Sequence, residues 1–164
     1  MTFEEKQKHI LGLLRISMGL ILLWAFFDKL FGLGFATLYN KSWLAGNSPT
    51  SGFLLNATHG PFAEFFKSLA GSGLVDWIFM LGLFLIGFSL LFGIFMKLAS
   101  YSGIAMFLLM WLALLPPENN PIFDEHIIYS LVLILLSFFK AGKYLGYSNL
   151  WIKTKLVIKY PFLE

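Results

Sequence analysis

Four long apolar stretches alternate with polar connections along the chain. They run over about 10–31, 77–96, 98–115 and 121–143. A helix needs about 20 mostly apolar residues to cross the hydrocarbon core of a bilayer, and each stretch comes near that length. Only Lys97 separates the second stretch from the third, so we expect a tight hairpin between them. The pattern predicts an all-α fold, a four-helix transmembrane bundle that forms one domain over residues 1–164.

The connections carry shorter amphipathic patterns. The first, about residues 32–76, contains four apolar residues that fall on one helical face: Phe62, Phe65, Phe66 and Leu69. This spacing predicts a short helix that lies in the outer interface and acts as a lid. The C-terminal stretch, residues 149–164, mixes aromatic and aliphatic residues with three lysines. It predicts a second interfacial segment, on the cytoplasmic surface, whose lysines contact anionic lipid.

The start of the fourth stretch is unusually polar. The sequence PPENNPIFDEHII, residues 116–128, places three acids and a histidine between two apolar runs. Asn120 has the chemistry of an N-cap, and Pro121 suits the first helical position. On that phasing Asp124 and Glu125 occupy the first turns, where the helix dipole favours anions. His126 then lies roughly 9 Å into the helix.

Small residues recur at spacings that allow helices to approach closely. The pairs are Ser89 with Gly93, Ala99 with Gly103, and Gly142 with Gly146. Small residues at helix contacts remove the bulk that would keep two backbones apart. A chain with 15 glycines also produces such pairs by chance, so both interpretations stay open.

Composition narrows the class of protein. The chain is 58% hydrophobic, 18% aromatic and only 13% charged, with a mean hydropathy of +0.76. These values lie outside the amino-acid composition of soluble proteins and indicate a membrane protein. The chain has no cysteine, which excludes disulfides, iron–sulfur clusters and thiolate zinc sites. Redox chemistry in this chain therefore requires a bound cofactor or substrate.

The cationic residues predict an orientation. Nine of the 12 Lys and Arg residues flank the N-terminus, the central hairpin or the C-terminal stretch: Lys6, Lys8, Arg15, Lys97, Lys140, Lys143, Lys153, Lys155 and Lys159. Cytoplasmic loops of membrane proteins are enriched in Lys and Arg. We therefore expect a multi-pass cell-membrane protein with both termini cytoplasmic, and we expect the N-terminal stretch to be retained as the first span.

Three charged residues lie within the first span. Arg15 lies close to the cytoplasmic end, where it can snorkel to lipid phosphates or pair with a buried partner. Asp28 and Lys29 lie about 20 Å further along the helix, toward the outer face. Ionisable groups at such depths are costly, which makes them candidates for function.

We therefore predict an outer-leaflet pocket in which the end of the first helix meets the start of the fourth. Its catalytic candidates are Asp28, Lys29, Asp124, Glu125 and His126. His126 is deep enough to be partly desolvated and can relay protons through Glu125 or Asp124. Two plainer interpretations stay open: Asp28 and Lys29 as a solvated pair, and His126 as a structural hydrogen-bond donor.

Other site classes have little support in the sequence. The three histidines, His9, His59 and His126, form no pair for haem and no closely spaced set for zinc, so we predict no metal site. The three acids of residues 116–128 can hold a hard cation or simply cap the turn. There is no phosphate loop or nucleotide fingerprint, and no nucleic-acid partner is implied.

The same residues give the chain a family resemblance. Arg15 is followed by LLWAFFDKL, SPTSGFL, FMLGLFLIGFSLLFG and LALLPPENNPIFDEHIIYSLVLILL. From Arg15 to about Lys140 this order resembles the DoxX/DoxD family of small four-helix membrane proteins. The resemblance implies relation to DoxD, the membrane subunit of a thiosulfate:quinone oxidoreductase of sulfur-metabolising archaea. That enzyme couples two thiosulfates into tetrathionate, passes electrons to a membrane quinone and acts with a second subunit, DoxA.

Two function classes follow for this chain. As an enzyme subunit it would oxidise thiosulfate or a similar small sulfur compound at the outer face, with quinone as electron acceptor. Lys29 would then attract the anion, and the quinone would bind among Trp24, Trp77, Trp111 and Asn120. As a non-catalytic scaffold it would use the same polar residues to dock a redox partner. In both cases membrane lipid is a partner, and a DoxA-like subunit is an expected one.

Overall fold

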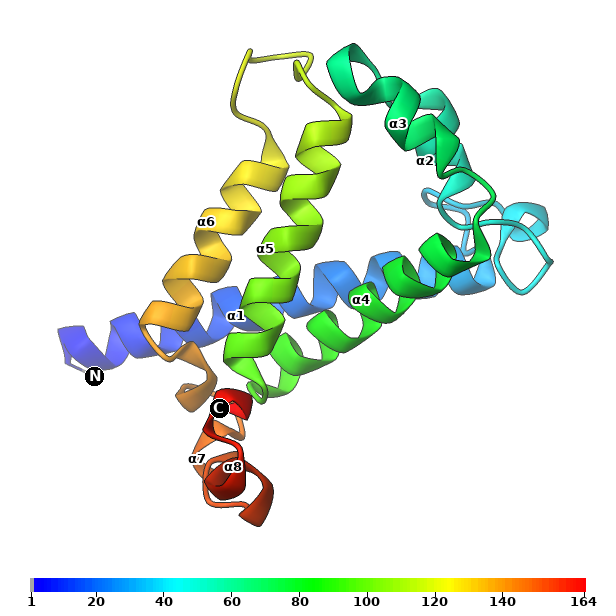
Figure 1. Cartoon of the computed structure of the whole chain (residues 1–164). Helices are drawn as coiled ribbons and strands as arrows, with labels where there is room; N and C mark the ends of the chain where they lie inside the picture. Colours follow the sequence, from blue (N-terminus) through cyan, green and yellow to red (C-terminus); the bar gives the residue numbers. More distant parts are fainter. Residues whose placement is uncertain (1) are drawn as a thin grey trace.

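Four helices form the body of the protein (Figure 1). The computed structural model describes residues 2–164. The helices are α1 (Phe3–Phe31), α4 (Gly73–Phe92), α5 (Met96–Ala113) and α6 (Glu125–Phe138). The first three are long and apolar enough to cross a membrane, whereas α6 has 14 residues. No strand occurs within residues 2–164, so the all-α prediction is confirmed and the fold is that of a small helical membrane bundle.

Helix α6 is shorter than the expected fourth span, 121–143. The Oδ1 atom of Asn120 accepts hydrogen bonds from the N–H groups of Ile122 and Phe123, both at 2.9 Å, and closes a turn instead of capping the helix. Asp124 is the N-cap. At the other end Lys140 adopts a left-handed conformation, with φ of 49°, after the last helical residue. At 1.5 Å per residue α6 is about 21 Å long.

The helices associate as two pairs, α1 with α4 and α5 with α6. The pairs meet at one end, where a short turn joins α4 to α5. Gly93 and Phe95 in this turn have φ angles of 72° and 51°, which confirms the tight hairpin. Towards their other ends the pairs diverge, and the connection between α1 and α4 bridges the two corners (Figure 1). This divergence decides which polar residues can meet.

Small residues allow the closest helix contacts. A Cβ atom on Gly19 would lie 2.9 Å from the carbonyl oxygen of Gly87, and one on Gly93 would lie 2.7 Å from that of Gly142. A Cβ on Gly103 would lie 2.6 Å from Cδ1 of Leu133. Of the two interpretations that the sequence left open, the packing role therefore holds for Gly93, Gly103 and Gly142. The α1–α4 contact through Gly19 and Gly87 was not predicted.

Arg15 is fully buried at the end where the two pairs meet. Its guanidinium donates to five backbone carbonyls: those of Leu90, Leu91, Ala141, Tyr144 and Leu145. Leu90 and Leu91 lie in the last turn of α4, whose carbonyls lack helical partners. Snorkelling to lipid is therefore the wrong interpretation of Arg15; its partners are backbone dipoles, not a carboxylate.

Short helices cover both ends of the bundle. In the first connection α2 (Ser51–Asn56) and α3 (Ala63–Ser68) pack on the end of α5 through a small cluster of Leu54, Phe66 and Ala113. After α6 the chain forms α7 (Ser148–Trp151) and α8 (Lys155–Lys159). The short helices expected in the lid and in the C-terminal stretch are therefore present. Phe62 and Phe65 remain exposed, whereas Phe66 is buried, so the aromatic run is divided between two surfaces.

Candidate functional site

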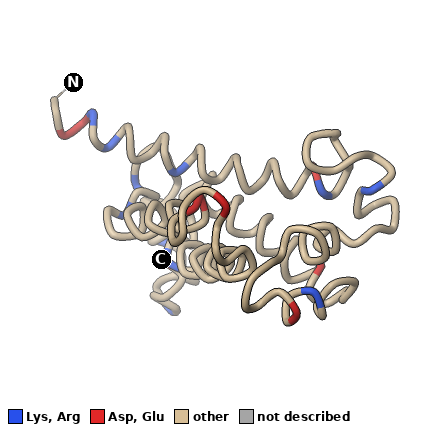
Figure 2. The backbone as a smooth tube through the Cα atoms, turned by 90° about the horizontal axis from the view of Figure 1, so that it is seen from above, with Lys and Arg blue, Asp and Glu red and all other residues tan. Residues whose placement is uncertain are grey.

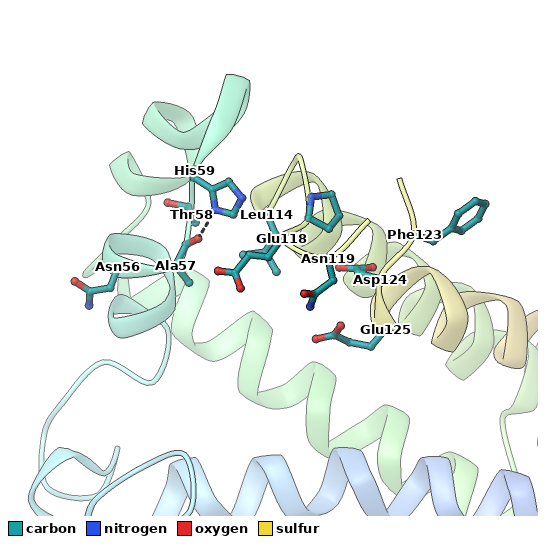
Figure 3. Close-up of a pocket in the computed structure, with 11 residues that line it drawn as sticks. Asn56, Ala57, Thr58, His59, Leu114, Glu118, Asn119, Phe123, Asp124 and Glu125 are labelled. Atoms are coloured by element: carbon teal, nitrogen blue, oxygen red, sulfur yellow. Dashed lines mark hydrogen bonds between the residues drawn. The ribbon is translucent and has the colours of Figure 1, made fainter. Parts of the chain in front are cut away.

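A polar pocket lies between the α2–α3 connection and the α5–α6 connection (Figure 3). Its volume is about 440 Å³. The polar side chains that line it are Asn56, Thr58, His59, Glu118, Asn119, Asp124 and Glu125. Seen from above, the acidic positions of the α5–α6 connection lie apart from the basic positions at the start of α1 (Figure 2). The pocket is therefore a water-accessible, mainly acidic site at one end of the bundle.

Asp124 connects this pocket to His126. Its Oδ1 accepts hydrogen bonds from the N–H groups of His126 and Ile127, at 3.0 and 3.2 Å, and so caps α6. Its Oδ2 lies 2.8 Å from Nδ1 of His126, whose side chain is only 8% exposed. A carboxylate can only accept, so Nδ1 carries a proton in this pair. The other ring nitrogen, Nε2, is then the atom that gains or loses a proton.

Aromatic residues of α5 and α6 lie near His126. The ring of Phe107 lies 6.2 Å from the imidazole, centroid to centroid, and the ring of Tyr129 lies 5.4 Å from that of Phe107. Within residues 2–164, Nε2 of His126 makes no hydrogen bond, whereas Nδ1 does. The imidazole thus has a carboxylate and the ring of Phe107 as neighbours, an arrangement suited to proton transfer at the edge of an apolar region.

Glu125 is exposed and lines the pocket next to Asp124. One ligand atom from each of Asp124, Glu125 and His126 can be chosen so that all three lie within 4.8 Å of one another. The sequence interpretation found no closely spaced ligand set, because it treated the acids and the histidine separately. The grouping is close enough for a shared cation, although exposed acids commonly group without one.

The structure does not bring Asp28 and Lys29 to this site. The Asp28 carboxylate is 2% exposed and accepts hydrogen bonds from the N–H groups of Phe35 and Ala36, at 3.2 and 3.0 Å. Nζ of Lys29 lies 5.9 Å from the ring centroid of Phe79 on α4. Both residues occupy the α1–α4 corner, away from the start of α6 (Figure 1). The expected meeting of these residues with His126 is therefore corrected, because the two helix pairs diverge towards these ends.

The four candidate quinone-binding residues divide in the same way. Trp24 packs edge-on against Phe35, with ring centroids 5.0 Å apart, and Trp77 packs against Trp43 at 4.6 Å. Both belong to the α1–α4 corner. Nε1 of Trp111 donates to the carbonyl oxygen of Ile122 at 2.8 Å and, with the Asn120 turn, shapes the α5–α6 connection. Trp24 and Trp111 therefore do not flank a common ligand.

Asp76 forms a second polar cluster that the sequence interpretation missed. It is 6% exposed in the first turn of α4. The hydroxyls of Ser48 and Thr50 both donate to its Oδ1, at 2.7 and 2.5 Å. One feature of the sequence could have indicated this cluster. The polar run SPTS contains Ser48 and Thr50, which precede Asp76 by 28 and 26 residues, and Asp76 is an acid at the start of a span. This cluster anchors the first connection to α4.

His59 is the other residue that sequence reasoning left without a role. Its Nδ1 lies 3.0 Å from the carbonyl oxygen of Ala57, and its Nε2 lies 2.8 Å from that of Pro116. Its backbone N–H also donates to the carbonyl oxygen of Ala113 at 3.3 Å. The hydrogen bonds to Pro116 and then Ala57 raise the pKa of His59 above its ordinary value. His59 therefore joins the first connection to the α5–α6 connection beside the pocket.

Comparison of the chain with protein-family models, with curated proteins and with solved structures finds no match.

Proposed function

We propose that this chain is an integral membrane subunit of a quinone-linked oxidoreductase that oxidises a small sulfur compound, as its resemblance to DoxD implies. The observation that supports this function best is the His126–Asp124 pair. A buried imidazole is bonded to a carboxylate that lines a polar pocket. Reduction of a quinone takes up protons as well as electrons, and this pair offers a path for protons from water to an apolar site.

In this reaction the chain itself supplies protons to the quinone. Two thiosulfates lose one electron each and form the S–S bond of tetrathionate, while a quinone gains two electrons and two protons. In the proposed function His126 donates a proton from Nε2 to a quinone oxygen in the outer leaflet and takes up a proton from water at the same atom. Asp124 holds Nδ1–H and stabilises the imidazolium form. The aromatic rings of Phe107 and Tyr129 provide apolar surroundings suited to a quinone head.

Charge argues against binding the sulfur anion in the pocket itself. Glu118, Asp124 and Glu125 line it, and Lys29 lies at the other corner of the bundle. Carboxylates repel a dianion. We therefore assign oxidation of the sulfur compound to a DoxA-like partner subunit, which must also pass the electrons to the quinone.

The membrane setting completes the proposal. With both termini cytoplasmic, the pocket faces outward. The C-terminal stretch exposes Leu150, Ile158 and Phe162 beside Lys153, Lys155 and Lys159. Such a segment lies in the interface and attracts anionic lipid.

A scaffold function is the alternative, and one observation favours it. The other buried charged groups form structural hydrogen bonds: Arg15 donates to backbone carbonyls, Asp28 accepts from backbone amides, and Asp76 accepts from hydroxyls. On this view Asp124 only caps α6, His126 only supports that cap, and the pocket docks a redox partner.

Quinone reduction by thiosulfate distinguishes the two. Membranes that contain the chain, with and without a DoxA-like partner, are assayed with a short-chain quinone. We expect His126→Gln and Asp124→Asn to lower the rate by about a hundredfold or more, the usual effect of losing a proton-transfer group. Glu64→Gln is the matched control, because Glu64 is an exposed acid outside the pocket. Unchanged rates in folded His126→Gln and Asp124→Asn variants would exclude the catalytic proposal and leave the scaffold.

A further inference from the structure

His59 bridges two segments that form opposite walls of the pocket. Asn56, Ala57 and Thr58 belong to the first connection, and Glu118, Asn119 and Asp124 belong to the α5–α6 connection or its junction with α6. The imidazole points from the first segment toward the second (Figure 3). Its Nε2 contacts the carbonyl oxygen of Pro116 and its Nδ1 that of Ala57.

Both contacts are made to oxygen atoms that can only accept. A neutral imidazole has one N–H and one bare nitrogen, so it can donate to one of these carbonyls and not to both. The imidazolium form donates from both nitrogens and satisfies both oxygens. The geometry is therefore complementary to the protonated ring. Hydrogen bonds from a charged donor are also stronger than those from a neutral one.

The charges around His59 favour the same state. The α5–α6 connection contributes Glu118, whose carboxylate attracts the imidazolium. Asp124 and Glu125 line the same pocket from the start of α6. The titratable groups of the pocket wall are thus all acidic apart from His59 itself.

The backbones of the two segments also lie in direct contact here. Gly60 has φ of 72°, and a Cβ atom at this position would overlap the carbonyl oxygen of Leu115. Only glycine fits this approach. The backbone N–H of His59 adds one hydrogen bond to Ala113, which does not depend on pH. Deprotonation of His59 therefore loosens the contact between the segments instead of abolishing it.

We propose that His59 is a proton-operated latch that holds the first connection against the α5–α6 connection and so controls how open the pocket is. The latch is tight when the ring is protonated and loose when it is neutral. As a regulator of proton access to Asp124 it rests on the proposed function; as a conformational device it does not.

The sign of the pH dependence follows from the raised pKa of His59. The protonated contact is fully present below the ordinary histidine value of about 6.5. It is lost as the pH rises through the folded-state pKa, which lies higher. The pocket should therefore keep the width seen in the structure in mild acid and become wider and more variable in alkali.

Spin labels across the pocket test the latch without any activity measurement. The chain has no cysteine, so Asn56→Cys with Asn119→Cys gives a clean label pair on opposite walls. In lipid nanodiscs we expect a narrow distance distribution below pH 6.5 that broadens severalfold once the pH exceeds the raised pKa.

Two variants make the result decisive. His59→Gln cannot titrate and should give the broad distribution at every pH, whereas His59→Arg keeps a charged, two-sided donor and should give the narrow one. A wild-type distribution that does not change with pH, or a Gln variant that titrates like the parent, would overturn the latch. A normal latch combined with active His126→Gln membranes would instead reject the proposed function and leave the latch intact.

Discussion

Nη2 of Arg15 donates a hydrogen bond to the carbonyl oxygen of Leu145, 2.9 Å away. This contact joins the first helix to the segment that follows the last long helix. The same guanidinium also donates to Leu90 and Leu91 at the end of α4 and to Ala141 and Tyr144 after α6. Arginine suits this position because its planar fork presents five N–H donors in fixed directions. One buried side chain thus connects three segments without a carboxylate partner.

Replacement of Arg15 should therefore destabilise the fold strongly. Arg15→Lys keeps the charge but places its donors on one nitrogen, which cannot reach all five carbonyls. We expect a loss of at least about 3 kcal/mol in the free energy of unfolding, because buried acceptors lose their donors. Thermal unfolding in detergent measures this loss. Lys6→Met on the exposed start of α1 is the control and should change little. Equal melting of Arg15→Lys and the parent would show that the carbonyl contacts add nothing.

The crossing of α1 and α4 should be sensitive to a single methyl group. A Cβ on Gly87 would lie 2.9 Å from Cγ of Leu23 and 3.0 Å from its backbone N. Gly87→Ala must separate the helices, and we expect a cost of about 1–3 kcal/mol. The matched control is Gly82→Ala in the same helix, where the nearest atom would be Sδ of Met106 at 3.6 Å. That change should be neutral or stabilise by up to about 1 kcal/mol, since alanine favours helix. Chemical unfolding of both variants compares them, and a Gly87→Ala variant as stable as Gly82→Ala would contradict the close crossing.

The apolar pattern was sufficient to predict the helices but not their arrangement. Runs of about 20 apolar residues were enough to predict the class of fold. The ends of α4 and α5 and the C-terminal end of α1 lie within a few residues of the expected ones, whereas α1 begins earlier than expected, at Phe3. The extent of α6 was wrong because Asn120 and Asp124 are both good caps, and only their hydrogen bonds decide between them. The divergence of the two helix pairs could not be predicted, because lipid-facing and core-facing apolar residues look alike in sequence.

The candidate site was predicted only where its residues are neighbours in sequence. Asp124, Glu125 and His126 lie together because one helix start places them there. Asp28 was included because it is an ionisable group within a span, but its carboxylate accepts hydrogen bonds from nearby amides. His59 was passed over because its partners are backbone carbonyls, which leave no trace in the identity of the residues that carry them.

The cluster around Asp76 should control the order of the first connection. Ser48 and Thr50 both donate to its Oδ1, and α2 begins directly after them. Asp76→Asn retains one acceptor oxygen but removes the charge that strengthens both bonds. Asp76→Ala removes the acceptor altogether. We expect amide hydrogen exchange in residues 48–56 to rise modestly in the first variant and strongly in the second. Asp124→Ala, which alters the other acidic site, should leave exchange in this segment unchanged. Equal protection in the parent and Asp76→Ala would show that the connection is held by α2 packing alone.

The end of the C-terminal stretch should detach in acid, because Glu164 holds it against the bundle. Its carboxylate lies 3.3 Å from Nζ of Lys97 and 3.5 Å from Nζ of Lys140. The hydrogen bond from Lys97, with the charge of both lysines, lowers the pKa of Glu164 below its ordinary value of 4.5. The stability from these contacts is therefore present above pH 4.5 and is lost as the pH falls through the lower, folded-state pKa.

Local hydrogen exchange is the suitable measurement for this detachment, because a partly exposed ion pair contributes at most about 1 kcal/mol to global stability. We expect exchange in residues 155–163 of the parent, corrected for the intrinsic effect of pH, to rise below pH 4.5. Glu164→Gln should show the raised exchange already at pH 7 and no further change in acid. Glu118→Gln, an exposed acid at the opposite end of the chain's last helix pair, should behave like the parent. If Glu164→Gln protects the segment as well as the parent does at pH 7, the segment is held by Trp151, which packs on Phe95 with ring centroids 4.4 Å apart and donates to the carbonyl oxygen of Leu163.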